Sequence, residues 1–124
     1  MELAKIHQDE RGEIWVLLIE GKEHTFLTVK KNFARGGCIH VFSQEHAVVI
    51  EGSVEYHIRG RRPRVYGKGE SISIPQNCPH YFVAVEDSIL LEWGPSPEEK
   101  KEKYKQWRKV VDKINKEAKS NSFI

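Results

Sequence analysis

The chain has 124 residues, which is enough for one domain with a core and leaves little room for a second. Hydrophobic residues make up 39% and aromatic residues 10%, which excludes a largely disordered chain. Twenty basic and 18 acidic residues leave a net charge of +2, which argues against a nucleic-acid-binding protein. No apolar segment resembles a signal peptide or is long enough to span a bilayer. We therefore expect a soluble, cytoplasmic protein without nucleic-acid or membrane partners.

Residues 1–95 predict a succession of short β-strands and no helix. The first strand is the apolar run Ile14–Ile19, and a Gly21-Lys22 turn leads into the β-forming stretch His24–Val29. We expect a loop over Lys30–Gly37. Further strands are predicted at 39–42, 47–50, 53–59, 64–66, 71–74, 80–85 and 88–93. Short strands with turn signals at short intervals are typical of a β-sandwich or barrel.

Residues 96–124 have a different pattern. Ser96, Pro97 and Glu99 form a helix-start signal, with a capping serine, a proline at the first helical position and a glutamate after the cap. Nine basic and five acidic residues fill most of the remaining positions. We expect a helix from about residue 97 to 118, packed on the barrel or on a second subunit. Its apolar residues fall on one stripe at helical spacing: Tyr104, Trp107, Val111, Ile114 and Ala118.

Four residues have the chemistry of metal ligands and lie where strands could bring them together. Cys38 and His40 alternate along one strand and therefore share a face. Glu45 lies on the way to the next strand, and His80 begins a later one. Sulfur, imidazole and carboxylate donors that converge in a concave site can bind a divalent ion. Two cysteines in total are too few for a disulfide framework, so we expect both to be thiols.

Two groups of residues with characteristic spacing carry a family resemblance. The first group comprises Gly36, Cys38-Ile39-His40, Glu45 and Gly52. The second comprises Gly69, Pro75, Asn77, His80 and Ala84. In this order and on an all-β pattern they resemble the two-part signature of the cupin superfamily. The chain departs from that signature at Cys38, which stands in place of a histidine, and at Asn77 and Ala84, which stand in place of a glycine and an asparagine.

The cupin resemblance implies an all-β fold: a single jelly-roll barrel over residues 1–95, followed by the amphipathic C-terminal helix in residues 96–124. It also implies one divalent metal ion held by Cys38, His40, Glu45 and His80. A thiolate in the first position would favour Zn²⁺ or a similar ion over an iron oxygenase site. On this interpretation the protein is a metal-binding cupin that serves as a non-catalytic ligand-binding or regulatory module.

A narrower resemblance suggests an enzyme. Asp9-Glu10-Arg11-Gly12, Arg35-Gly36 and Gln44 resemble segments of the cupins that isomerise or epimerise nucleotide-linked sugars. The resemblance implies a carbohydrate or nucleotide-sugar ligand in the barrel and metal-free proton transfer. His40 would act as the base, with Glu45 and His80 as further acid/base groups. The implied substrate contacts are Arg35, which would face a phosphate or carboxylate, Gln44 and Tyr81. We also expect a homodimer, because the run Trp15–Ile19 and the tail stripe offer apolar surface to cover.

Overall fold

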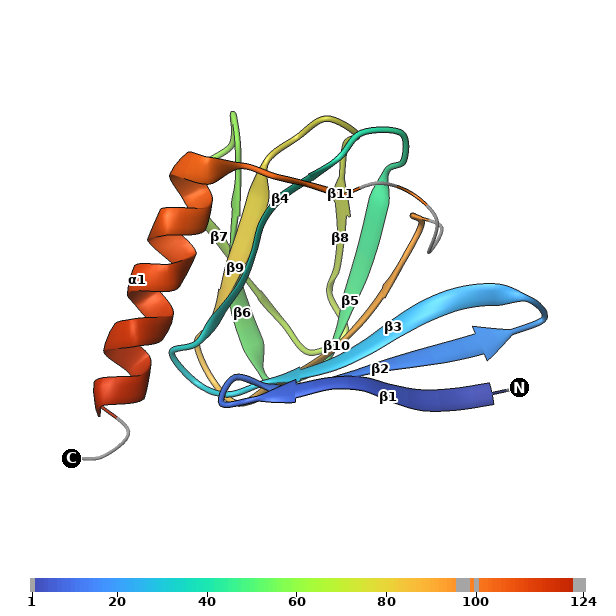
Figure 1. Ribbon diagram of the computed structural model, residues 1–124, viewed down its shortest axis with the longest axis horizontal. Coiled ribbons are helices and arrows are strands. Elements are labelled where there is room, and N and C mark those ends of the chain that lie inside the picture. The colour runs from blue at the N-terminus through green and yellow to red at the C-terminus, as the bar shows by residue number, and fades with distance from the viewer. Residues whose placement is uncertain (1, 96–98, 100, 122–124) are drawn as a thin grey trace.

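A computed structural model describes residues 2–95, 99 and 101–121 (Figure 1). These residues form eleven strands and one helix, and the strands make two antiparallel sheets that face each other. The first sheet has six strands, in the spatial order β1 (Glu2–Asp9), β2 (Gly12–Ile19), β3 (Lys22–Val29), β10 (Ser88–Trp93), β5 (Glu45–Glu51) and β8 (Ser71–Ile74). The second has five, in the order β11 (Lys101–Lys103), β4 (Ala34–His40), β9 (His80–Ala84), β6 (Ser53–Ile58) and β7 (Arg64–Gly67).

The chain crosses between the two sheets, so neighbours in a sheet are often distant in sequence. Strand β10 lies between β3 and β5, and β9 lies between β4 and β6. This arrangement is a jelly-roll barrel, as the sequence predicted. Alternation along each strand sends every second side chain inward. The resulting core includes Leu27, Val49, Tyr56, Ile74 and Leu90, each at most 3% exposed.

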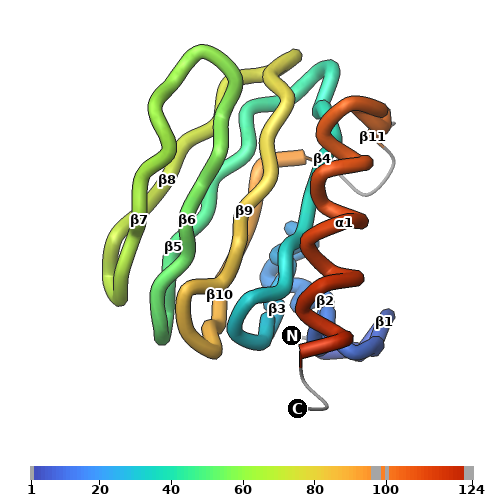
Figure 2. The backbone as a smooth tube through the Cα atoms, turned by 90° about the vertical axis from the view of Figure 1, so that its left-hand side faces the viewer, coloured from blue at the N-terminus to red at the C-terminus, as the bar shows by residue number. Residues whose placement is uncertain are grey.

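The single helix, α1 (Lys105–Asn121), packs against the outer face of the second sheet beside β4 (Figure 2). A small second core forms there, from Ala34, Tyr81 and Val111 with the half-buried Trp107 and Ile114 around them. The predicted apolar stripe is therefore the docking face. Among the described residues, no helix is both long and apolar enough to cross a membrane.

Polar contacts fix the position of α1 on β4. The side-chain amide of Asn115 accepts a hydrogen bond from the Ala34 N–H at 2.7 Å and donates one to the Ala34 carbonyl at 3.0 Å. Arg108 donates a hydrogen bond to the carbonyl of Gly36 at 2.9 Å. The helix thus satisfies backbone groups of a strand whose outer edge faces it, which is how a buried strand avoids unpaired polar groups.

The structure differs from the predicted elements in three places. Strand β1 was not predicted, because its residues are nearly all exposed and carry no clear apolar alternation. The expected loop over 30–37 contains the start of β4, whose Gly36-Gly37 pair resembles a turn in the sequence. The expected helix over 97–118 begins only at Lys105, and strand β11 occupies part of the range. The Ser96-Pro97 part of the helix-start signal lies outside the described residues.

Strands β1, β2 and β3 form a ribbon that extends from the barrel (Figure 1). The apolar run of β2 is only half-buried along most of its length, and Leu3 and Ile6 of β1 are 60% and 62% exposed. A continuous apolar run is the pattern of a strand that is covered on both faces.

Candidate metal centre

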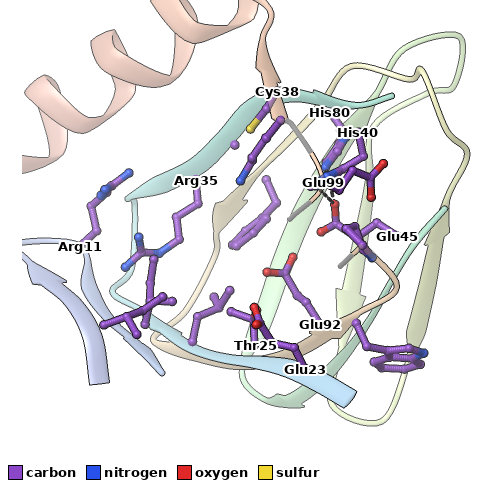
Figure 3. A pocket seen from close by; sticks show the side chains of 18 of the residues that line it. Arg11, Glu23, Thr25, Arg35, Cys38, His40, Glu45, His80, Glu92 and Glu99 are labelled. Atoms are coloured by element: carbon purple, nitrogen blue, oxygen red, sulfur yellow. Dashed lines mark hydrogen bonds and ion pairs between the residues drawn. The ribbon is translucent and has the colours of Figure 1, made fainter. Parts of the chain in front are cut away.

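Three side chains from three strands converge inside the barrel (Figure 3). Nε2 of His40 and Nε2 of His80 lie 2.9 Å and 3.0 Å from the same atom, Oε2 of Glu45. These side chains are largely shielded from solvent, with 14%, 7% and 9% of their surfaces exposed for His40, His80 and Glu45. One donor atom from each lies within 4.8 Å of the others, so the group could hold a metal ion.

A β-bulge explains how β4 directs its functional side chains. Arg35 and His40 are five positions apart, so in a regular strand they would lie on opposite faces. The pairing with β9 shifts register between Gly36 and Cys38, where both glycines have positive φ, 112° for Gly36 and 81° for Gly37. A bulge of this kind reorients the side chains that follow it. As a result Arg35, Cys38 and His40 all line the cavity.

The hydrogen bonds of His80 orient its ring. Its Nδ1 lies 2.9 Å from the carbonyl oxygen of Cys78, and a carbonyl can only accept, so Nδ1 donates. Its Nε2 lies 3.0 Å from Oε2 of Glu45, a carboxylate oxygen that can only accept, so either a proton on Nε2 donates to that oxygen or a bound cation lies between the two atoms. A backbone carbonyl that holds the second ring nitrogen is the usual support of a metal-binding histidine.

A second carboxyl group, Glu92 of β10, lies in the same wall and interacts with Glu45. Burial raises the pKa of Glu92 well above its usual value, and the charge of Glu45 raises it further. Burial also acts to raise the pKa of Glu45, but hydrogen bonds from His40, His80 and Glu92 together outweigh it and hold that pKa well below its usual value. Between these two groups the proton therefore favours Glu92 over Glu45.

The cavity around this group has a volume of about 500 Å³. Such a volume falls within the range of small-molecule sites. Its wall combines apolar and charged side chains. The apolar residues include Ile14, Leu27, Phe82 and Trp93, and the basic residues are Arg11, Arg35, Lys101 and Arg108.

Cys38 does not belong to the three-residue group, so its role as a fourth ligand stays a prediction. Its side chain lines the cavity and is 7% exposed, but its thiol interacts with the Lys101 side chain. Burial raises the pKa of the Cys38 thiol, and the positive charge of Lys101 offsets only part of this effect. A neutral thiol is a poor metal ligand, because the thiolate is the binding form.

Two predicted substrate contacts lie outside the cavity. Tyr81 follows His80 on β9, so its side chain must point to the opposite face, where its ring packs edge-on against Trp107 at 5.2 Å and stacks on His57 at 4.5 Å. Gln44 is exposed, just before β5 begins, and does not line the cavity. The third predicted contact, Arg35, lines the cavity and is 6% exposed.

Sequence reasoning missed several charged residues of the cavity, among them Glu92, Glu99 and Lys101. Glu92 shares a face of β10 with the buried Leu90, so alternation along that strand was a usable signal. Glu99 and Lys101 follow the barrel strands and were assigned to the tail helix. In the structure β11 pairs with β4 and sets Lys101 opposite His40, and a carboxylate oxygen of Glu99 accepts a hydrogen bond from the Phe42 N–H at 2.7 Å.

Comparisons with known proteins agree with the fold and the motifs. Residues 35–93 match the family model described as the cupin domain. These residues contain all three members of the candidate metal centre. The match covers just under half of the chain, and together with the two-part signature and the jelly-roll barrel it supports membership of the cupin superfamily. A comparison with curated protein sequences gave no match.

Several solved structures share the fold at low sequence identity. A mutant of the oxalate decarboxylase OxdC from Bacillus subtilis has a TM-score of 0.69 and 19% identity, over 84% of this chain and 30% of that chain. The capsular polysaccharide assembling protein CapF from Staphylococcus aureus has a TM-score of 0.69 and 17% identity, over 83% of this chain and 32% of that chain. KdgF from Halomonas sp. has a TM-score of 0.65 and 16% identity, over 77% of this chain and 90% of that chain. The chain thus spans about a third of the first two proteins and nearly all of the third.

Proposed function

We propose that the protein is a metal-binding cupin enzyme that moves a proton within a carbohydrate-type small molecule, as in an isomerisation or epimerisation. The observation that carries the proposal is the convergence of His40, Glu45 and His80 in the barrel cavity, where one donor atom from each lies within 4.8 Å of the others.

The three residues fit a divalent metal ion. Imidazole nitrogen and carboxylate oxygen are donors that such ions accept. One donor atom from each of the three residues lies within 4.8 Å of the others. Because Cys38 is not in the group, the donor set is two nitrogens and one oxygen, and the thiolate no longer argues for zinc in particular. Such a set also suits iron, manganese, nickel or cobalt.

When bound, a divalent ion polarises a carbonyl or hydroxyl oxygen as a Lewis acid. The chain's own groups would handle the proton. Glu92 lines the cavity beside Glu45, and its raised pKa favours the protonated form, so it is placed to give a proton to a ligand atom and take it back. The apolar part of the wall would keep bulk water from the reacting carbon.

A metal-free version of the same chemistry is the second candidate, and the ion pairs favour it. Glu45 is within hydrogen-bonding distance of both imidazoles. A carboxylate that orients a histidine makes it a better-placed base. In that case His40 or His80 would remove the proton directly, as the sequence resemblance implies.

Metal analysis of the purified protein separates the two candidates. We expect one ion per chain in the wild type and its loss in His80→Ala and Glu45→Gln. His57→Ala is the matched control, because His57 also pairs with a carboxylate, that of Glu55 at 2.6 Å, but outside the cavity. Adding metal back to stripped protein at 100 times its dissociation constant should stabilise the fold by about 2.7 kcal/mol. Stoichiometric metal in His80→Ala, or no binding by the wild type, would refute the metal centre.

Activity is tested by proton exchange. A panel of aldoses, ketoses and nucleotide-sugars in D₂O, followed by NMR, should show deuterium entering the carbon next to the carbonyl of one substrate. Metal-loaded protein that binds a sugar without exchange would instead support the non-catalytic binding module.

We also propose that the protein is a cytoplasmic homodimer. The exposed apolar residues of the β1–β3 ribbon support an interface between two copies. Light scattering on a sizing column is the test, and a monomer at working concentration would count against it.

A further inference from the structure

We propose that Arg35 forms an anion subsite in the barrel cavity, which selects ligands that carry a carboxylate or phosphate group at the end away from the metal centre. That the ligand is a sugar derivative rests on the proposed function. The subsite itself depends only on Arg35 and its surroundings.

Arg35 is a buried cation without a matching anion. Its residue is 6% exposed, and its Nε is buried with no hydrogen-bond partner. Its guanidinium donates a long hydrogen bond, from Nη2 to the carbonyl of Thr28 at 3.4 Å. No carboxylate within residues 2–95, 99 and 101–121 forms an ion pair with it. A guanidinium has five N–H donors, so most of its capacity is unused.

The other arginines near the cavity or on the surface show what a satisfied guanidinium looks like here. Arg11, which also lines the cavity, donates to Asp9 from Nε at 3.0 Å and from Nη2 at 2.6 Å. Arg64, on the exposed β7, pairs with Glu70 at 3.0 Å. Arg35 is more buried than either and has no such partner. Buried charges are normally paired, and an unpaired one destabilises the fold unless a ligand supplies the counter-charge.

The electrostatic surroundings of Arg35 agree with this interpretation. Burial lowers the pKa of Arg35 to about 10, and the positive charge of Arg11 adds to the shift. Asp9 and Glu92 act to raise the pKa, but neither forms an ion pair with Arg35 and they do not cancel the shift. The guanidinium is still cationic at neutral pH. An anion between the two arginines would offset both the burial of the Arg35 charge and its repulsion by Arg11. The planar guanidinium of Arg35 can donate two parallel hydrogen bonds to a carboxylate or phosphate.

The position of Arg35 separates the anion subsite from the metal centre. Figure 3 shows Arg35 and Arg11 on one side of the cavity, with His40, Glu45 and His80 on the other. Arg35 and His40 are five residues apart on β4, at most roughly 17 Å along the strand. A sugar acid or a sugar phosphate has its anionic group at one end and hydroxyl or carbonyl oxygens along the rest of its length, so it offers different groups to the two sides of the cavity. The cavity of about 500 Å³ has room for either.

Calorimetric titration of metal-free protein tests the subsite by itself. The metal is stripped with a chelator, which is then removed because it is itself an anion. The probes are glucuronate, glucose 6-phosphate and neutral glucose. We expect at least one charged sugar to bind ten times more tightly than glucose or better, and the stronger of the two shows whether a carboxylate or a phosphate is preferred. Equal binding of charged and neutral sugars, or no measurable binding of either charged sugar, overturns the proposal.

Three variants tie the preference to Arg35. Arg35→Gln should lose the preference for charged sugars, and Arg64→Gln, the exposed control, should keep it. Arg35→Met, which removes the buried charge at similar length, should have a higher Tm than the wild type without ligand, because the cation is unpaired there. A lower Tm, or failure of both Arg35 variants to fold, would mean that Arg35 is structural and overturns the proposal. Since no metal is present, these results are independent of whether His40, Glu45 and His80 bind one.

Discussion

Replacing Gly37 by alanine should separate the conformational and the packing roles of the β4 bulge. Gly37 has a φ of 81°, which favours glycine. A Cβ atom built there would lie 3.0 Å from the Cα of Arg108 in α1, and that neighbour is backbone that cannot rotate away. The matched control is Gly60→Ala. Gly60 has a φ of 85°, and a Cβ there would meet nothing within 4 Å.

The two substitutions share one cost and differ in the other. An L-residue in the left-handed region costs about 1–2 kcal/mol, and this is the whole expected effect of Gly60→Ala. Gly37→Ala adds the cost of forcing α1 away from β4, about 1–3 kcal/mol for overpacking. At roughly 3–5 °C of Tm per kcal/mol for a domain of this size, Gly37→Ala should melt some 3–15 °C below Gly60→Ala.

Thermal unfolding followed by circular dichroism gives the comparison, and chemical denaturation gives the free energies. The reasoning would be refuted by equal destabilisation of the two variants. That result would mean that α1 yields freely at Gly37 and that its contact with the bulge is not tight.

Two further substitutions test contacts at the ends of β4 and β1. Asn115→Ala should lower the free energy of unfolding by about 2–4 kcal/mol, because the buried N–H and C=O of Ala34 both lose their partner. Faster hydrogen exchange of the Ala34 amide would report the lost contact, and unchanged protection of that amide would contradict the prediction. Asp9→Asn should lower the free energy of unfolding by at most about 1 kcal/mol at pH 7, since the ion pair of Asp9 is partly exposed and solvent screens it. Partial burial acts to raise the pKa of Asp9, but hydrogen bonds from Arg11 and His7 outweigh it and hold the pKa below its usual value. Its stabilisation is therefore fully present above about pH 4 and disappears as the pH falls towards the folded pKa. Denaturation from pH 7 to pH 2 should show the wild type and the variant converging; a constant gap would contradict the assignment.

The sequence was informative where a pattern and a spacing agreed. Alternation located most of the strands from β2 to β10, and the two-part signature identified His40, Glu45 and His80, which the fold then brings together. It was not informative about side-chain direction near irregular backbone. His80 and Tyr81 were both assigned to the site, although neighbours on a strand point to opposite faces. Here alternation alone would have excluded Tyr81.

Other features depended on tertiary contacts that leave no local signal. The bulge at Gly36-Gly37 looks like a loop in the sequence, because a glycine pair marks a turn more often than a bulged strand. Strand β11 is Lys-Glu-Lys, which has no β-forming character, and it pairs with β4 only because the chain passes there on its way to the helix. The deep burial of Arg35, a residue type that is seldom buried, could be seen only once the register of β4 was known.

The C-terminal helix and the site are connected through the bulge. Without the register shift, a regular β4 would turn either Arg35 or His40 away from the cavity. Before the bulge the outer edge of β4 is not paired with β11, which reaches only residues 38–40. Asn115 and Arg108 of α1 provide hydrogen bonds to Ala34 and Gly36 at that edge. The helix is therefore more than a cover on the barrel. Its contacts stabilise the one backbone arrangement in which the proposed anion subsite and the proposed metal centre face the same cavity.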